Sequence, residues 1–216
     1  MRKLYFLSLF LLTSIILTES CQNKVKSDTA KEQIVNAKEK NETKTVQEKL
    51  ENYNIDTKNS VVEWVGTKTT GSHNGIIKIS KGLILTDKKG EIKSGKFMIN
   101  MNSIECTDLS GGKKESIEEH LKDADFFNTI EYPNAYFTIT EVISTTIFGT
   151  LTIKGITAKI NFEYNKLNDH QYEAEIVIDR TLFDIKYKSK TIFPELGDNF
   201  IHDEFIIKLN PLSILK

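Results

Sequence analysis

The sequence predicts an all-β fold of about eight antiparallel strands with one short helix, preceded by a polar N-terminal segment. From Lys58 onward, β-branched and aromatic residues alternate with polar residues, as in strands that bury one face. Several gaps between these strands, such as 165–170, have the length of hairpin loops, so neighbouring strands should pair antiparallel. Such a series of short strands is typical of a barrel or a sandwich, and the residue pattern leaves these two open.

The first 21 residues have the pattern of a bacterial signal peptide. A positively charged start precedes the apolar run 4–17, which is shorter than the roughly 20 residues of a membrane-spanning helix. Cys21 then stands where the lipid-bearing cysteine of a lipoprotein cleavage box stands, although Thr18 and Glu19 depart from the commonest box. We expect an exported, membrane-anchored, periplasm-facing lipoprotein with Cys21 as the lipidation site. The alternative is an ordinary secretory signal with an unrelated cysteine.

Residues 22–57 are expected to form a spacer. This segment is polar and highly charged, and it has no aromatic residue before Tyr53, so it cannot bury a core. It is either a disordered tether or partly helical, since 30–50 is rich in helix formers. The globular domain is then predicted to span 58–216.

The predicted elements follow one another closely along this domain. A helix is expected at 116–124, where helix-forming residues interrupt the alternation. The predicted strands are 61–68, 75–85, 93–104, 135–143, 147–154, 157–164, 171–180 and 204–209, with 182–188 as a possible further strand.

Within these strands, every second residue is apolar, which predicts one dry and one wet face. In 171–180, for example, Ile176 and Ile178 share a face that lies opposite Glu175 and Asp179. The residues predicted to line the interior are Ile77, Ile79, Phe97, Ile99, Met101, Phe137, Ile139, Leu151, Ile153, Ile160, Phe162, Ile176, Ile178 and Arg180. Their apolar side chains either interlock as a filled core or surround a tunnel.

Arg180 is the exception on this dry face, where an unpaired charge is costly. We expect it to have a partner. One hypothesis is a structural ion pair with Asp125, Asp184 or Asp203 that closes one end of the barrel. The other is a contact to a phosphate or carboxylate of a ligand.

Several short motifs, in their order along the chain, resemble the YceI-like family. The resemblance covers roughly 57–216. It is carried by Asn102-Ser103-Ile104-Glu105-Cys106-Thr107, Glu119-His120-Leu121-Lys122-Asp123-Ala124-Asp125-Phe126-Phe127, Tyr132-Pro133, Gly149-Thr150-Leu151-Thr152-Ile153-Lys154-Gly155, and Arg180 followed by Phe183.

The resemblance implies a lipocalin-like, extended antiparallel barrel whose interior holds a long polyisoprenoid chain. It also implies a carrier or store for amphiphiles in the periplasm. Residues 187–198 depart from the family pattern as a long, insertion-like loop, which could cover one mouth of the barrel.

Other classes of function find little support in the sequence. Lys and Arg number 29 against 30 Asp and Glu, so no charge excess points to a nucleic-acid partner. The four histidines have no metal-ligand spacing, and phosphate-binding and dinucleotide motifs do not occur. We therefore expect no metal, no cofactor and no catalytic residue. His120 is expected to fix the helix to the barrel rim through a hydrogen bond.

Three functional hypotheses remain. The first is a lipoprotein that binds an apolar-tailed amphiphile, a polyisoprenoid or an isoprenoid quinone, inside the barrel. The second is a structural or partner-binding lipoprotein with a filled barrel. The third is an enzyme acting on a bound lipid, with His120 or Asp125 as acid or base; both side chains pointing to solvent would count against it.

Overall fold

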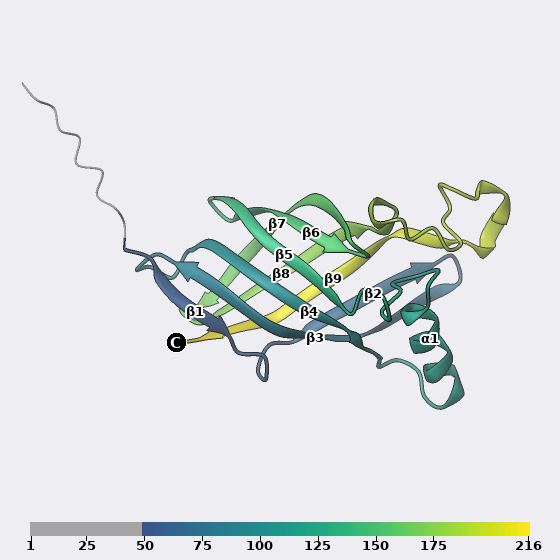
Figure 1. Cartoon of the computed structure of the whole chain (residues 1–216), viewed down its shortest axis with the longest axis horizontal. Coiled ribbons are helices and arrows are strands. Elements are labelled where there is room, and N and C mark those ends of the chain that lie inside the picture. The colour runs from purple at the N-terminus through teal and green to yellow at the C-terminus, as the bar shows by residue number, and fades with distance from the viewer. Residues whose placement is uncertain (1–48) are drawn as a thin grey trace, which may run out of the picture. The chain divides into compact units, whose positions relative to one another are not determined.

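The structure is a computed structural model that describes residues 49–216; the predicted signal peptide, Cys21 and residues 22–48 of the predicted spacer lie outside this range. The described part contains nine strands, one α-helix and two short 3-10 helices (Figure 1). The elements are β1 Glu51–Ile55, β2 Val62–Lys68, β3 Gly71–Thr86, β4 Ile92–Cys106, α1 Gly112–Lys122, β5 Asn134–Ile143, β6 Thr146–Ile153, β7 Ile156–Asn168, β8 Gln171–Asp179, η1 Arg180–Phe183, η2 Pro194–Asn199 and β9 Ile201–Leu215.

Eight of these strands close into an antiparallel barrel. The order around the barrel is β2, β9, β8, β7, β6, β5, β4 and β3, and β3 pairs again with β2. Most neighbours are joined by short turns, such as the β6–β7 turn at Lys154-Gly155, where both residues have positive φ. The predicted all-β barrel of about eight strands with one short helix is confirmed.

β1 corrects the predicted start of the domain, because it lies inside the range 22–57 that we assigned to the spacer. It pairs with the end of β3 (Glu51 opposite Thr86) and with the end of β9 (Ile55 opposite Ile214). β1 and β2 therefore share one strand position between β3 and β9. The short strand was missed because only Tyr53 and Ile55 enter the core, between polar neighbours.

The eight predicted strands correspond to β2–β9, with shifted ends. β9 continues to Leu215, six residues past its predicted end. The predicted strand was too short because Asn210-Pro211 reads in sequence as a strand terminator. The possible further strand at 182–188 was wrong. There the Asp179 side chain accepts a hydrogen bond from the Thr181 N–H (2.8 Å) and caps η1 instead.

Bulges change which residues of β3 face the interior. Gly75, Ile77 and Ile79 are buried, but farther along the strand the buried positions are Ile84 and Thr86. The β3–β4 register shifts at Ile79/Lys81, between these two sets. An extra residue in one strand moves the following side chains to the opposite face.

The two ends of the barrel are built differently (Figure 1). At one end lie α1, the β6–β7 turn, η1 and the 186–200 segment; we call it the α1 end. Here Lys154 Nζ donates to the carbonyl oxygens of Ala124 (3.5 Å) and Asp184 (3.4 Å) and links the β6–β7 turn to the residues that follow α1 and η1. The opposite end carries the β3–β4 hairpin 87–91, the β7–β8 turn and the start of β1; we call it the hairpin end.

Candidate functional site

A cavity of about 200 Å³ lies inside the barrel. Its wall contains inward-facing residues from all eight barrel strands, together with Leu121 of α1 and Phe126-Phe127 of the following turn. A buried water needs roughly 10–15 Å³ of such space, so the cavity has room for roughly 13 waters or more. Because its wall is almost wholly apolar, this space suits hydrocarbon better than water.

All fourteen residues predicted to line the interior stand in the cavity wall. The structure brings together Ile77, Ile79, Phe97, Ile99, Met101, Phe137, Ile139, Leu151, Ile153, Ile160, Phe162, Ile176, Ile178 and Arg180. Strand alternation was a sufficient signal for these positions. That they contact a ligand stays a prediction.

Sequence reasoning missed other wall residues for identifiable reasons. Ile84, Ile92 and Ile104 lie beside the irregular stretches of β3 and β4, where the parity of the strand changes. Leu121, Phe126 and Phe127 come from outside the strands, although they belong to the His-Leu and Asp-Phe-Phe motifs on which the family resemblance rests. The sole tryptophan, Trp64, also lines the cavity and was not among the predicted residues.

The hairpin end of the cavity is closed. Tyr164 and Tyr172 are 2% and 1% exposed, and their rings pack edge to face across the floor. The Tyr172 hydroxyl donates to the Gly90 carbonyl oxygen (2.8 Å), and the Tyr164 hydroxyl donates to Glu91 (3.0 Å) and accepts from the Ile92 N–H (3.2 Å). Burial raises the pKa of Tyr164 to about 12, so this hydroxyl stays protonated at neutral pH.

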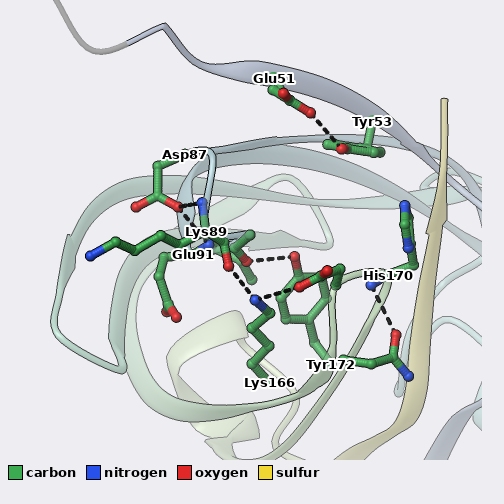
Figure 2. Close-up of polar contacts among 12 residues, drawn as sticks. Glu51, Tyr53, Asp87, Lys89, Glu91, Lys166, His170 and Tyr172 are labelled. Atoms are coloured by element: carbon green, nitrogen blue, oxygen red, sulfur yellow. Dashed lines mark hydrogen bonds and ion pairs between the residues drawn. The ribbon is translucent and has the colours of Figure 1, made fainter.

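Polar contacts outside this floor hold the hairpin in place (Figure 2). Asp87 accepts hydrogen bonds from the N–H groups of Lys89 (2.8 Å) and Glu91 (2.9 Å). Lys166 donates to the carbonyl oxygen of Lys89, which ties β7 to the hairpin tip. The hairpin is therefore fixed across this end by its own turn and by two strands of the opposite wall.

Arg180 closes part of the α1 end. It is 1% exposed, and its guanidinium donates to the carbonyl oxygens of His202 (3.1 Å), Ile185 (2.9 Å) and Ile201 (3.0 Å), and to Asp203 Oδ1 (3.5 Å). These contacts join η1 to the start of β9. Of the three predicted partners, Asp203 is the one found, so the geometry agrees with the structural hypothesis for Arg180.

Burial acts on the pKa values of Arg180 and Asp203 in opposite directions. Burial lowers the pKa of Arg180, and the nearby Asp203 opposes that change. Burial would raise the pKa of Asp203, but hydrogen bonds from Ser189 and Thr191 outweigh it and the pKa is lowered. Asp203 is thereby kept as an anion beside the guanidinium.

His120 and Asp125 do not form an acid–base pair facing the cavity. Their side chains are 30% and 50% exposed, and neither residue is in the cavity wall. His120 Nδ1 lies 3.8 Å from Asp125 Oδ1, which is too long for a hydrogen bond. The predicted hydrogen bond from His120 to the barrel rim is also wrong: the ring packs between Phe126 (centroids 5.5 Å apart) and Tyr187 (4.3 Å).

The α1 end is the more open end of the cavity. The cavity wall at this end includes three partly exposed aromatic residues, Trp64, Phe127 and Phe205. Glu204, which also belongs to the wall, is exposed. The predicted loop at 187–198 lies at this end and contains η2. We call this opening the mouth.

Other polar groups of the described chain form structural contacts. Cys106 is buried and donates to Asp108 Oδ1 (3.1 Å), and burial raises the pKa of its thiol, which does not suit a nucleophile. Within residues 49–216, no group of three or more His, Cys, Asp or Glu side chains is placed to hold a metal ion. None of the helices in that range is long and apolar enough to cross a membrane.

Comparison with known families gives one match that covers most of the chain. The model of the YceI-like domain matches residues 53–211. Among curated proteins, a UPF0312 protein of Staphylococcus aureus strain USA300 is 33% identical over 81 residues, 35% of this chain and 47% of the relative. The corresponding protein of strain MSSA476 is 41% identical over 67 residues, 30% of this chain and 39% of the relative. The chain thus spans less than half the length of these curated relatives.

Among solved structures, BcnA of Burkholderia cenocepacia is similar over 75% of this chain and 99% of its own, with a TM-score of 0.57 and 20% identity. This likeness supports the fold. A polyisoprenoid binding domain from Saccharophagus degradans, implicated in plant cell wall breakdown, covers 75% of this chain and 97% of its own, with a TM-score of 0.49 and 15% identity.

Proposed function

Since the chain belongs to the YceI-like family, we propose that its barrel binds the apolar tail of a long amphiphile, a polyisoprenoid or an isoprenoid quinone, and serves as a carrier or store. The observation that carries this proposal is the cavity, which is closed at the hairpin end and lined almost wholly by apolar side chains. Each methylene moved from water into such a wall contributes about 0.8 kcal/mol. A long tail therefore supplies enough free energy for binding without any covalent step.

The two other hypotheses find less support. A filled barrel is at odds with the cavity of about 200 Å³. An enzyme that uses His120 or Asp125 is at odds with their position outside the cavity wall, as described above. A binding protein without catalytic residues is the simplest function that this cavity supports.

The proposed setting is the periplasmic face of a membrane, with the protein anchored through lipidated Cys21. The support is the signal-peptide pattern and the cysteine at its end. Metabolic labelling with palmitate should mark the wild-type protein, and Cys21→Ser should abolish the label and release the protein from membranes. A labelled Cys21→Ser variant would contradict lipidation at this residue.

The binding proposal is tested by extracting purified, untagged protein with organic solvent and analysing the extract by mass spectrometry. We expect about one polyprenyl-tailed molecule per chain. Ala174→Phe places a ring into the cavity from β8 and should reduce the lipid content several-fold. Val177→Phe, which changes a 54% exposed residue of the same strand, is the matched control and should retain the lipid.

Two outcomes would count against a lipid carrier. The first is an empty extract together with no binding of added polyprenyl lipids to the purified protein. The second is an equal lipid content in Ala174→Phe and wild type, because the lipid would then lie outside the cavity.

A further inference from the structure

Trp64 carries a buried N–H group without a hydrogen-bond acceptor. Within residues 49–216, only two buried side-chain polar atoms lack a partner, Trp64 Nε1 and His120 Nε2, and only Trp64 lines the cavity. A buried donor without a partner costs about 1–3 kcal/mol, and the N–H of a buried tryptophan usually has one. The orphan donor at the mouth therefore points to an acceptor supplied by a ligand.

The fold makes a place for this indole ring. Trp64 lies opposite Gly75 on β3, and a Cβ added at residue 75 would come within 2.7 Å of the ring carbon Cε2. The ring thus lies directly on the glycine backbone, and a larger residue at 75 would collide both with the ring and with the Glu105 carbonyl oxygen, which would lie 1.9 Å from the added Cβ.

The other buried side-chain donors in the cavity wall are already in use; His202 also lines the wall but is exposed. The hydroxyl groups of Tyr164 and Tyr172 bind the hairpin at the closed end. Arg180 donates to three carbonyl oxygens and to Asp203. Trp64 Nε1 is therefore the buried side-chain donor of the described wall that remains available to the headgroup of a ligand at the mouth.

The charged side chains of the cavity wall itself do not favour an anionic headgroup. Arg180 is the cation of the described wall, and its charge is balanced by Asp203 at 3.5 Å. Glu204 also lines the cavity and brings negative charge. A phosphate drawn into the wall beside Trp64 would lose water without gaining a free cation from the wall, which is costly in an apolar site.

We propose that Trp64 Nε1 donates a hydrogen bond to a neutral acceptor oxygen in the ligand headgroup, a carbonyl of the quinone, ester or amide class, and that the site rejects phosphate-headed polyprenyl lipids. This inference rests on the proposed function, because it requires the apolar tail to occupy the cavity. It distinguishes between the two ligand classes that the family resemblance leaves open.

The first test uses the single indole N–H resonance of this chain, which has one tryptophan. Delipidated, ¹⁵N-labelled protein is titrated with three ligands that share a twenty-carbon isoprenoid tail: menaquinone-4, geranylgeranyl monophosphate and the hydrocarbon phytane. Menaquinone-4 should move the indole proton downfield, as expected for a new N–H···O=C bond, whereas phytane should bind without that shift.

The second test compares affinities of the same ligands for Trp64→Phe, which keeps an aromatic ring and removes the donor. Wild type should bind menaquinone-4 at least tenfold more tightly than geranylgeranyl monophosphate. Trp64→Phe should lower the affinity for menaquinone-4 about tenfold and leave that for phytane within twofold. Phe205→Leu, which removes apolar wall at the same end, is the control and should weaken all ligands alike.

The outcomes separate this inference from the proposed function. If none of the three ligands binds, the lipid-binding function fails. If all three bind wild type equally, or Trp64→Phe weakens phytane as much as menaquinone-4, the assignment of Trp64 fails while lipid binding stands. A preference for the phosphate would overturn the charge argument directly.

Discussion

Arg180 shows what a single residue's position in sequence can and cannot reveal. Strand alternation placed it on the dry face, and an unpaired charge there demanded a partner. The alternation could not identify that partner, because the three carbonyl oxygens come from 185 and 201–202, segments whose path depends on η1 and the following loop. The local pattern thus predicted that Arg180 has polar partners, and only the tertiary structure identifies them.

Replacing Arg180 by Met should destabilise the fold. The substitution leaves the acceptors at Ile185, Ile201 and His202 unpaired and Asp203 without its cation. Removing one partner of a buried pair costs about 3–5 kcal/mol. Urea unfolding should show this loss, and lipid content should be measured in parallel. Lost lipid with unchanged stability would contradict the structural role and support a contact to ligand.

Asp108 should give the protein an acid-sensitive contribution to stability. Burial would raise its pKa, but hydrogen bonds from the Asn74 N–H (3.0 Å), His73 (2.9 Å) and Cys106 (3.1 Å) outweigh it and lower the pKa from 3.8 to about 2. A carboxylate with a depressed folded-state pKa stabilises the fold above its unfolded pKa, and this stabilisation is lost as the pH falls toward 2.

Asp108→Asn should therefore lower the free energy of unfolding at pH 7 by on the order of 1 kcal/mol, a figure reduced for the partial exposure of the site. The difference from wild type should shrink as the pH falls from about 4 to about 2. Urea unfolding across this range measures it. A difference that is independent of pH would show that Asp108 does not titrate as described.

At the scale of elements, the strands with regular alternation were predictable and the irregular ones were not. β5, β6 and β8 were located within one or two residues of their ends, since alternation and hairpin loops agree there. β3 and β4 contain bulges, so alternation read from one half assigns the other half to the wrong face. The wall residues Ile84 and Ile104 were missed for this reason.

β1 was missed although it completes the strand position that it shares with β2. A chain that begins at Lys49 should be more stable than a chain that begins at Lys58, because the shorter one loses Tyr53 and Ile55 from the core. Burial of each side chain contributes about 1.5–3 kcal/mol, so the expected difference is roughly 3–6 kcal/mol. Equal urea midpoints and slopes for the two chains would mean that β1 adds nothing to the barrel.

At the scale of the whole molecule, residue patterns predicted strands but left barrel and sandwich open. Closure depends on β3 meeting β2, a pairing between strands at a register that no local pattern encodes. The residue pattern also could not predict the cavity, because the same inward-facing apolar side chains can either interlock as a filled core or surround an open space. The family resemblance was needed to favour the hollow barrel, and the structure agrees with it.

A hollow barrel should depend on its contents for part of its stability. A ligand that binds only the folded state at a free concentration 100 times its Kd adds about 2.7 kcal/mol. Delipidated protein should therefore melt at a lower temperature than protein as purified, and added menaquinone-4 should restore the melting temperature. Ala174→Phe, with its cavity partly filled, should show a smaller change. Equal melting temperatures with and without lipid would contradict binding of lipid to the folded barrel.

The pairing of Lys216 with Glu51, whose charged atoms lie 3.3 Å apart, brings both ends of the described chain to the hairpin end. A fusion partner, a fluorescent label or a surface attached through either of these ends would hold the barrel by its closed floor. The mouth with Trp64 would then remain free. The molecule could be immobilised on a sensor chip in this orientation, and lipid exchange could be followed without a tag obstructing the route into the cavity.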